Sequence, residues 1–585
     1  MYAQVIVLTY QAPDIDSFTY EVPKELEREI KVGQLVEVPF GKRSPMGVVI
    51  HVETRDTGHV TREIKTVKPI SKIIFDRPLL LPYQIDLIKW MASYYLAPMV
   101  NCLEAALPPL NVKRLMSSAD KNSSVSRSTL VISQSLILVP AINRIPETLA
   151  KFPKAKKYVI FHSELKTSEK FSAWTKIISG EADYIFGSRQ AIFAPCPNLK
   201  EIIIYDEHDG AYKDNRSPYF DILTVAQKVT QLTNAQIKIA DPSPKITTYF
   251  QMKKHIKIQT FPQKTQIVDM QNEKISGSKS PISFSLEEEI NDVLDRNGKI
   301  LLFLNKKKES GQVFCRTCKT SSRLEKQPTA CPNCNSPDIF WNILNVNSLH
   351  AEAKKLFPST NVALFSEGSS PSMVVDKRSI DIGTAFSLYS MHLEKYDLVA
   401  HISADSLLNL ADYTSGEKFM AQVTQLKKLL TPGAKLFLQT FSPDHHSITA
   451  AQKGDYRLFY SEELKERKSL SYPPYSLIVK LTFRDKSEDK VKKDAQYFYE
   501  KLLSTINHKP RPAGAAEDRK LRLLTVLGPY KSVFWQKIPT YHIILKHKIK
   551  DYSIAEREKS VSLLSKYLEK DRKKYTIEIE PEGIQ

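Results

Sequence analysis

Short apolar runs that alternate with helical stretches constrain the fold of this chain more than any other feature of its sequence. They form two series, one after Thr129 and one after about residue 262. The runs lie at 135–140, 156–162, 182–188, 201–205 and 236–241, and then at 265–270, 299–305, 361–366, 381–384, 397–403 and 435–441. Apolar runs of this length, bounded by helices, are typical of strands buried in a parallel sheet. The sequence therefore predicts two similar parallel α/β lobes.

Residues 1–108 precede the first series and are expected to form a β-rich domain. An alternating run at 32–41 is followed by a turn and a second alternating run at 46–53, which predicts a β-hairpin. Apolar residues at helical spacing over 83–97 predict a helix behind it. The hairpin and the helix together give this part of the chain a separate core.

Changes in composition predict the other domain limits. Residues 109–128 are polar, rich in serine and without periodicity, so we expect a linker. The two lobes then occupy 129–261 and 262–450, and an α+β domain follows at 451–585. Its expected strands and its basic helix lie at 477–483, 541–548 and about 555–570.

The charge of the chain points to a polyanionic partner. Lys and Arg number 84 and Asp and Glu number 65, which gives a net charge of +19. Such an excess favours nucleic acid, with a membrane surface as the second choice. No run approaches the ~18 apolar residues of a membrane span, and the N-terminal residues lack the basic and apolar regions of a signal peptide. We therefore expect a cytoplasmic, nucleoid-associated protein without a membrane partner.

Four of the 6 cysteines form two close pairs. Their spacing is C-x2-C-x12-C-x2-C, with the thiols at Cys315, Cys318, Cys331 and Cys334. Two residues between cysteines let both thiolates reach one ion from a tight turn, and two such turns complete a tetrahedral zinc shell. The spacing predicts one structural Zn²⁺ in an insertion at 314–342. Four thiolates leave no open position for water, so a catalytic zinc is not expected.

Several segments, in order along the chain, together resemble the PriA family of replication-restart helicases. EVPFGKRSPMGVV and ASYYLAP resemble the family's N-terminal domain, and FGSRQAIFAP and YDEHDGAYK resemble its first helicase lobe. FCRTC and CPNCNS resemble its zinc insertion, and KERKSLSYPPYSLIV resembles the start of its C-terminal domain. The resemblance implies two RecA-like lobes with a zinc-ribbon insertion, a DNA-binding N-terminal domain that holds a 3′ end, and an α+β C-terminal domain.

The phosphate-binding loop of this family is missing. A motor of this type needs G-x-x-x-x-G-K-[ST], whose backbone N–H groups and lysine hold the phosphates. The printed sequence contains no such segment, and residues 111–135 contain no glycine where the loop belongs. The family's winged-helix module between the N-terminal domain and the first lobe is also absent by this comparison. We therefore expect a degenerate helicase core with no functional ATP–Mg²⁺ site.

The acidic box of the first lobe departs from the family pattern. The family has Asp-Glu-Glu-His after an apolar strand. Alignment on His208 without a gap places Tyr205 at the position of the metal ligand. A shift by one residue restores Asp206 and Glu207 as the acidic pair. We favour the register without a gap, which makes Asp206, Glu207 and His208 vestigial. The plainer alternative is that these carboxylates cap the strand end or pair with Lys213.

The family's arginine finger is also lost. Its Q-V-A-G-R-A-G-R motif corresponds to residues 422–429, where both arginine positions hold leucine. Lys427 and Lys428 supply charge there, but not the planar two-pronged donor of arginine. Loss of such a finger costs about 10³- to 10⁵-fold in the rate of phosphoryl transfer. The sequence therefore predicts no catalytic residue and an inactive enzyme.

By the same resemblance, four residues form the pocket for the 3′-terminal nucleotide. They are Phe18, Thr19, Gly41 and Lys65. Phe18 would stack on a base, Gly41 would let the backbone approach closely, and Lys65 would meet a phosphate or the terminal hydroxyl. The family often has an acidic residue where Thr19 stands. The plain alternatives are that Phe18 is hairpin core, that the turn requires Gly41, and that Lys65 is an ordinary surface lysine.

Other basic residues are candidates for contacts to the DNA backbone. Lys546, Lys548 and Lys550 alternate along an expected strand, so they are predicted to share one face as a phosphate-binding stripe. Further candidates are Lys42, Arg43, Lys113, Arg114 and Lys306, Lys307 and Lys308.

These observations predict a catalytically inactive DNA-binding protein of replication restart. It would recognise forked DNA with a 3′ end and act as a platform for other primosome or single-strand-binding proteins. The first rival is an active ATP-dependent 3′-5′ DNA helicase with a divergent nucleotide site. A second rival is a protein–protein scaffold in which the basic charge is incidental.

Overall fold

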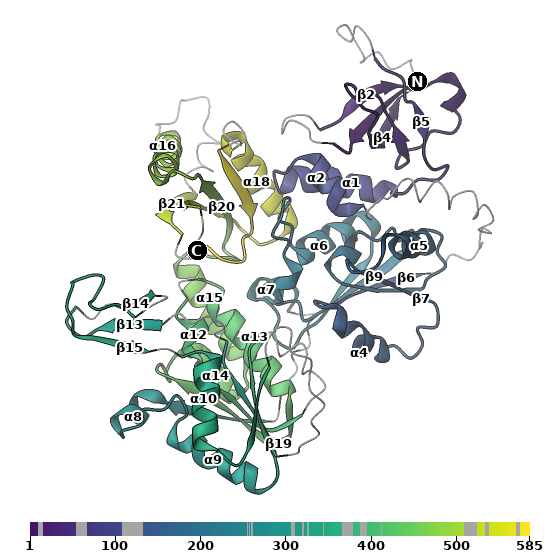
Figure 1. The fold of residues 1–585 in the computed structure, drawn as a ribbon. Coiled ribbons are helices and arrows are strands. Elements are labelled where there is room, and N and C mark those ends of the chain that lie inside the picture. The colour runs from purple at the N-terminus through teal and green to yellow at the C-terminus, as the bar shows by residue number, and fades with distance from the viewer. Residues whose placement is uncertain are drawn as a thin grey trace. The chain divides into compact units, whose positions relative to one another are not determined.

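The computed structural model divides the chain into two compact units (Figure 1). Unit 1 comprises Met1–Lys257 and Arg467–Gln585, and unit 2 comprises Ile258–Glu466. The structure describes residues 1–9, 16–53, 67–107, 133–253, 256, 258, 261, 263–305, 311–318, 321–324, 327–342, 344–365, 378–385, 395–410, 412–507, 523–532, 538–568 and 574–584. The predicted linker at 109–128 lies outside these residues, and the predicted domain limits stay predictions.

The N-terminal part of unit 1 is an antiparallel sheet of order β2-β1-β4-β3-β5. Its strands are β1 (Tyr2–Val7), β2 (Phe18–Glu21), β3 (Leu35–Glu37), β4 (Met46–Glu53) and β5 (Lys72–Ile73). Leu35 of β3 pairs with Val48 of β4, which confirms the predicted hairpin. Val5, Val36 and Val49 are fully buried because alternate strand residues face one core.

Two helices follow this sheet, α1 (Pro82–Tyr94) and α2 (Met99–Ala106). The helix predicted over 83–97 is confirmed as α1, and it ends three residues earlier. Ile85, Ile88 and Met91 of α1 are buried, as their spacing of three requires.

A parallel five-stranded sheet of order β10-β9-β6-β8-β7 forms the next part of unit 1. Its strands are β6 (Gln134–Leu138), β7 (Tyr158–Phe161), β8 (Tyr184–Gly187), β9 (Leu199–Tyr205) and β10 (Gln236–Ala240). The connecting helices are α4 (Ile145–Ala150), α5 (Thr167–Ile178), α6 (Ile222–Thr233) and α7 (Ile246–Met252). Each strand coincides with an apolar run of the first series, so the prediction of a parallel lobe is confirmed here.

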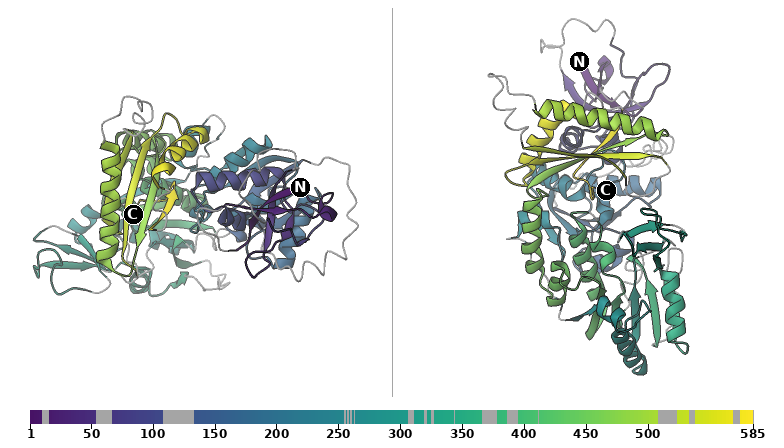
Figure 2. Two further views of the ribbon diagram at one scale, coloured as in Figure 1. Left: turned by 90° about the horizontal axis from the view of Figure 1, so that it is seen from above. Right: turned by 90° about the vertical axis from the view of Figure 1, so that its left-hand side faces the viewer.

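The C-terminal part of unit 1 is an antiparallel sheet of order β21-β22-β20-β23 with two helices. The elements are β20 (Ser476–Arg484), α16 (Glu488–Asn507), β21 (Leu524–Lys531), β22 (Thr540–Lys548), α18 (Ile554–Leu568) and β23 (Tyr575–Ile579). Figure 2 shows the long helix α16 lying along this sheet. The ring of Phe498 in α16 packs against Phe483 and Tyr575, with centroids 6.0 and 4.7 Å apart.

Unit 2 is built on a second parallel sheet, of order β11-β19-β18-β12-β17-β16. Its strands are β11 (Lys264–Asp269), β12 (Lys299–Phe303), β16 (Asn361–Phe365), β17 (Ser379–Gly383), β18 (Tyr396–His401) and β19 (Leu430–Thr440). Its helices are α8 (Met270–Ile275), α9 (Phe284–Asp295), α10 (Val346–Leu356), α12 (Asp405–Leu408), α13 (Ser415–Lys428), α14 (His446–Lys453) and α15 (Tyr456–Ser469). These strands confirm the second predicted lobe.

A small antiparallel sheet of order β14-β13-β15 is inserted into unit 2 between β12 and α10. Its strands are β13 (Gly311–Cys315), β14 (Ser321–Leu324) and β15 (Ile339–Asn342). It carries the predicted cysteine insertion, so the expected fold class is confirmed. Among the described residues, no helix combines the length and the apolar character that crossing a membrane requires.

Candidate metal centre and nucleic-acid interface

The four paired cysteines meet in one cluster at the end of β13. The Sγ atoms of Cys315 and Cys334 lie 3.5 Å apart, and those of Cys318 and Cys331 lie 3.7 Å apart. All four sulfur atoms lie within 4.8 Å of one another. Tetrahedral coordination with Zn–S bonds of about 2.3 Å places sulfur atoms about 3.8 Å apart. The cluster therefore has the dimensions of a metal site with four thiolate ligands.

Backbone N–H groups point at the sulfur atoms, as a metal knuckle requires. The N–H of Cys318 donates to Cys315 Sγ at 3.4 Å, and the N–H of Asn333 donates to Cys331 Sγ at 3.4 Å. The N–H groups of Cys334 and Asn333 lower the pKa of the Cys331 thiol. Asn335 adopts φ +58°, which closes the second turn. These bonds favour the thiolate of Cys331, which is the form that binds metal. At Cys334 the N–H of Ser336 lowers the pKa, but the neighbouring thiols outweigh it and raise the pKa to about 12.

In the N-terminal sheet, Phe18 and Thr19 lie on β2, opposite Val5 and Gln4 of β1. Phe18 is half-buried, and its ring meets the ring of Phe40 edge-on, with centroids 5.0 Å apart. Phe40 directly precedes Gly41, so the ring contact places Phe18 close to the turn that contains Gly41. The sequence reading missed Phe40, although its place next to Gly41 was visible.

Gly41 has φ +61°, and a Cβ atom added there would meet no described atom within 4 Å. The glycine therefore serves the turn, and the space around it is open. Lys42 and Arg43 follow it on the exposed turn that the backbone bonds between Phe40 and Arg43 close at 2.8 and 3.1 Å. Lys65 lies outside the described residues, as do Lys113, Arg114 and Lys306, Lys307 and Lys308.

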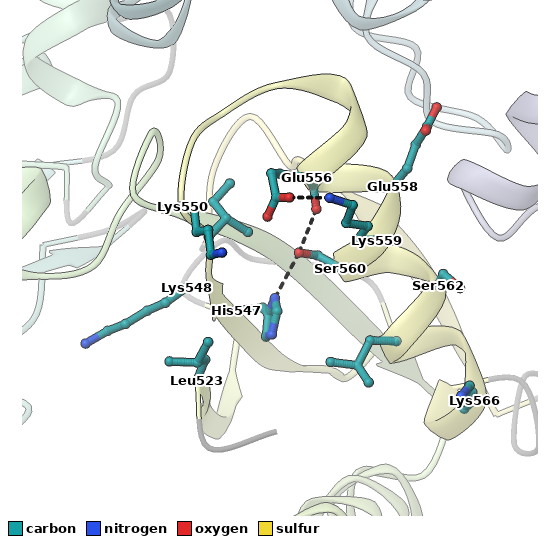
Figure 3. A pocket seen from close by; sticks show the side chains of 12 residues that line it. Leu523, His547, Lys548, Lys550, Glu556, Glu558, Lys559, Ser560, Ser562 and Lys566 are labelled. Carbon is teal, nitrogen blue, oxygen red and sulfur yellow. Dashed lines mark hydrogen bonds and ion pairs between the residues drawn. The ribbon is translucent and has the colours of Figure 1, made fainter. Parts of the chain in front are cut away.

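A basic cavity of about 780 Å³ lies in the C-terminal part, between the end of β22 and the outer side of α18 (Figure 3). Four lysines line it: Lys548, Lys550, Lys559 and Lys566. Glu556 pairs with Lys559 at 2.6 Å, and buried His547 bonds the Ser560 hydroxyl at 2.9 Å. Glu556 and Glu558 also line the cavity, so its lysines exceed its carboxylates by two.

The predicted lysine stripe is wrong at Lys546, which is buried. It is only 6% exposed, its Nζ lies 3.5 Å from the ring centroid of Tyr472, and it donates to the carbonyl of Leu470 at 3.2 Å. Burial lowers the pKa of Lys546 to about 8. This face of β22 is therefore covered, and only Lys548 and Lys550, beyond the covered part, stay exposed.

The acidic box follows β9, and Glu207 within it is 1% exposed. Its carboxylate accepts a bond of 2.9 Å from the backbone N–H of Lys245 and another of 2.9 Å from the Thr248 hydroxyl. The ammonium of Lys245 lies 3.7 Å away. Burial raises the pKa of Glu207 to about 7 against the opposing charge of Lys245. The start of α7 therefore supplies one hydrogen-bond donor to each oxygen of this carboxylate.

His208 and Lys213, which are close to Glu207 in the sequence, also form hydrogen bonds. The Nδ1 of His208 lies 2.7 Å from Asp241 Oδ2, and the pKa of Asp241, which burial alone would raise, is lowered by His208. Asp206 adopts φ +47°. Lys213 donates to the carbonyls of Ile579 and Glu580 at 3.0 and 2.8 Å. Of the plainer alternative, the part in which the carboxylates pair with Lys213 is therefore wrong.

The segment at the finger position, 422–429, is packed inside unit 2. Gln422 Oε1 bonds His401 Nε2 at 2.7 Å, and Lys427 donates to the carbonyl of Ala451 at 3.0 Å. Burial lowers the pKa of Lys427 to about 8. Leu426 and Leu429 are buried, so the residues at both arginine positions point into the core.

The chain is similar in sequence to known proteins. Residues 6–108 match the family model PriA_3primeBD, described as a 3′DNA-binding domain. The chain is 26% identical to the replication restart protein PriA of Synechocystis sp. over 74% of this chain and 58% of that protein. It is 27% identical to PriA of Bacillus subtilis over 77% of this chain and 59% of that protein. The chain thus spans less than two thirds of the length of each of these two relatives.

A third relative is matched along nearly its whole length. Treponema pallidum PriA is 23% identical over 92% of this chain and 95% of that protein. Among solved structures, the DUF1998 helicase MrfA bound to DNA has a TM-score of 0.32 at 9% identity, over 65% of this chain and 48% of that one. RecG bound to a three-way DNA junction has a TM-score of 0.29 at 11% identity, over 67% and 50%.

Proposed function

Because this chain belongs to the PriA family, we propose that it binds branched DNA in replication restart. The single observation that carries this proposal is the match of residues 6–108 to a 3′DNA-binding domain. The net charge of +19 supports the same partner, because a protein gains affinity for DNA by replacing counterions at phosphates. We infer that the preferred ligand is a fork with an accessible 3′ end.

The 3′ end is proposed to bind beside Phe18, Thr19 and Gly41. The ring of Phe18 is half-buried and held in place by Phe40, so its exposed part offers a pre-ordered surface for a terminal base. The open space around Gly41 admits the backbone of the nucleotide. The Thr19 hydroxyl would offer one hydrogen bond, and Lys65 is proposed to meet the terminal phosphate or hydroxyl.

The cysteine cluster is proposed to hold one structural Zn²⁺. The sulfur separations and the N–H···S bonds support zinc, because thiolate ligands in this geometry suit it. The ion would hold the turn after β13 to the turn before β15, so that the small sheet stays ordered. It would take no part in chemistry.

ATP hydrolysis is proposed to be lost. The sequence lacks the phosphate-binding loop and both finger arginines, and in the register without a gap Tyr205 takes the position of the metal ligand. Glu207, the best-placed acid of the box, is bonded to the start of α7 and is 1% exposed. A carboxylate that is already bonded on both oxygens is poorly placed to orient water. The rival function, an active 3′-5′ DNA helicase, is supported by similarity to PriA proteins over most of the chain.

In this proposal the protein acts as a platform. It would bind a stalled fork through the 3′ end and through backbone contacts, and would recruit other primosome or single-strand-binding proteins. Such a role places it in the cytoplasm, on the nucleoid.

The binding proposal is tested with forked DNA that carries either a free 3′ hydroxyl or a 3′ phosphate. The wild-type protein is expected to bind the free end more tightly, and Phe18→Ala is expected to weaken binding of the free end about five- to hundredfold, since stacking contributes about 1–3 kcal/mol. Phe284→Ala, an exposed aromatic residue of α9, is the matched control. Equal affinity for both forks, unchanged by Phe18→Ala, would contradict the pocket.

The loss of catalysis is tested by measuring phosphate release with and without the fork. We expect no DNA-stimulated hydrolysis above the rate without protein. DNA-stimulated turnover that Glu207→Gln abolishes would establish the rival function and leave the DNA-binding proposal intact.

A further inference from the structure

A histidine and two glutamates form a cluster in unit 2 that includes none of the cysteines. His446 begins α14, and Glu463 and Glu466 lie one turn apart on α15. The Nε2 of His446 lies 3.2 Å from Glu463 Oε2, and its Nδ1 lies 3.6 Å from Glu466 Oε1. One donor atom from each of the three residues can be chosen such that all lie within 4.8 Å of one another.

The site has one buried side and one open side. The side chain of Glu463 is 7% exposed, that of His446 is 19% exposed, and that of Glu466 is 63% exposed. The open side would let an ion and its water enter.

A buried hydroxyl beside Glu463 lacks a partner. Ser447 is fully buried, and its Oγ has no hydrogen-bond partner among the described residues. A Cβ atom on Gly416 would stand 3.0 Å from both Ser447 Oγ and Glu463 Oε2. Because Gly416 has no Cβ, the Ser447 hydroxyl and the Glu463 carboxylate can both lie near its Cα, and this carboxylate is the one that contacts the imidazole of His446.

We propose that His446, Glu463 and Glu466 form a second divalent-metal site that takes Zn²⁺. One imidazole nitrogen with two carboxylates is a donor set that zinc accepts, and water fills the fourth position. Bonds of about 2.1 Å in tetrahedral coordination require ligand atoms about 3.4 Å apart. The two glutamates approach different nitrogens of the imidazole, at 3.2 and 3.6 Å, so the exposed Glu466 carboxylate would turn toward the Nε2 side when the ion binds. A water on the ion would give the Ser447 hydroxyl the partner it lacks. The ion would tie α14 to α15.

The alternative is an ion pair in which a protonated His446 is held by two carboxylates. Measuring the zinc content of the protein distinguishes the metal site from the ion pair. The full-length protein is freed of loosely held metal, equilibrated with Zn²⁺ in buffer, desalted, and assayed for zinc per chain. We expect the cysteine cluster and this site to contribute one ion each. His446→Ala and Glu463→Gln are expected to lose one ion and to keep the other.

His445→Ala is the matched control, because His445 stacks on His446 with centroids 4.6 Å apart but lies outside the ligand set. It is expected to keep both ions. Glu466→Gln, on the exposed side, is expected to weaken zinc binding at least tenfold without disturbing the fold. Mg²⁺ is expected not to displace the zinc, since imidazole is a poor ligand for Mg²⁺.

Two results would overturn the proposal. The first is that zinc is lost only when the cysteines are replaced. The second is that wild type, His446→Ala and Glu466→Gln contain equal amounts of zinc. Because Glu466 is exposed, its variant gives an answer even if His446→Ala fails to fold. Neither result depends on whether the protein binds forked DNA.

Discussion

The hydroxyl of Thr248 donates a hydrogen bond of 2.9 Å to Glu207, although 41 residues separate them in the sequence. The bond joins the loop after β9 to α7. Together with the bond from the N–H of Lys245, it occupies both carboxylate oxygens of Glu207. The residue that most resembles a catalytic acid is therefore part of the packing of its own sheet.

This burial gives the stability of unit 1 a pH dependence. The pKa of Glu207 is raised by burial from 4.5 to about 7, so the folded state binds this proton more tightly than the unfolded state does. The contribution to stability is fully present below pH 4.5 and is lost as the pH rises through 7. We expect Glu207→Gln to gain up to about 3 kcal/mol relative to wild type between pH 4.5 and pH 8.

The measurement is the free energy of unfolding by denaturant at several pH values for both proteins. Glu201→Gln is a suitable control, because the pKa of Glu201 is lowered: burial raises it, but the bonds from Lys238 and Ser135 outweigh that effect. A difference between Glu207→Gln and wild type that stays constant with pH would contradict the raised pKa.

A buried ion pair joins α18 to Glu580, the residue that follows β23. Arg557 Nη1 lies 2.6 Å from Glu580 Oε1, and the side chains are 2% and 10% exposed. Tyr94 and Tyr552 also donate to Glu580, at 2.9 and 2.8 Å. Arg557→Met leaves this carboxylate buried without its cation. We expect a loss of about 3–5 kcal/mol in the free energy of unfolding.

The double variant Arg557→Met with Glu580→Gln removes both charges and is expected to recover part of the loss, as a double-mutant cycle would report. Lys559→Met, which breaks an exposed pair with Glu556 on the same helix, is expected to leave the stability nearly unchanged. Equal effects of Arg557→Met and Lys559→Met would show that the buried pair is not essential.

Most of the sheet architecture was predictable from local pattern. Apolar runs such as 201–205 and 299–305 form interior strands of the two parallel sheets, because a strand covered on both faces has no polar side. The cysteine spacing likewise predicted the cluster, since a tight turn brings both thiols of a pair together. In these cases the information lies within a few residues of the chain.

Contacts between distant segments were not predictable in this way. Alternation along β22 suggested a lysine stripe, but Tyr472 covers the face on which Lys546 lies. Lys213 lies near acidic residues in sequence and yet donates to carbonyls of residues 579 and 580. Phe40, which supports Phe18, also escaped notice. The partners of Lys546 and Lys213 lie so far along the chain that they leave no local signal in a single sequence, whereas the position of Phe40 next to Gly41 was visible in it.

The cysteine cluster makes metal removal a direct test. Cys318→Ser is expected to lose one tightly held Zn²⁺ per chain and to lower the melting temperature of the small sheet. A chelator is expected to do the same to wild type, because metal binding and folding of such knuckles are coupled. Cys102→Ser, at a buried cysteine outside the cluster, is the control for zinc content. Unchanged zinc in Cys318→Ser would refute the assignment of the cluster as a zinc site.

The basic cavity beside α18 predicts a salt-dependent contribution to DNA binding. Lys548 and Lys550 are exposed at its edge, and Figure 3 shows both side chains at one side of the cavity. Each lysine that meets a phosphate adds about one unit to the slope of log affinity against log salt. We expect Lys548→Gln with Lys550→Gln to weaken fork binding at low salt and to reduce this slope by about two.

Lys154→Gln with Lys156→Gln makes the same change of charge on exposed residues outside the cavity, and is expected to leave the slope nearly unchanged. Equal slopes for both double variants would mean that the cavity makes no specific contact with the DNA backbone.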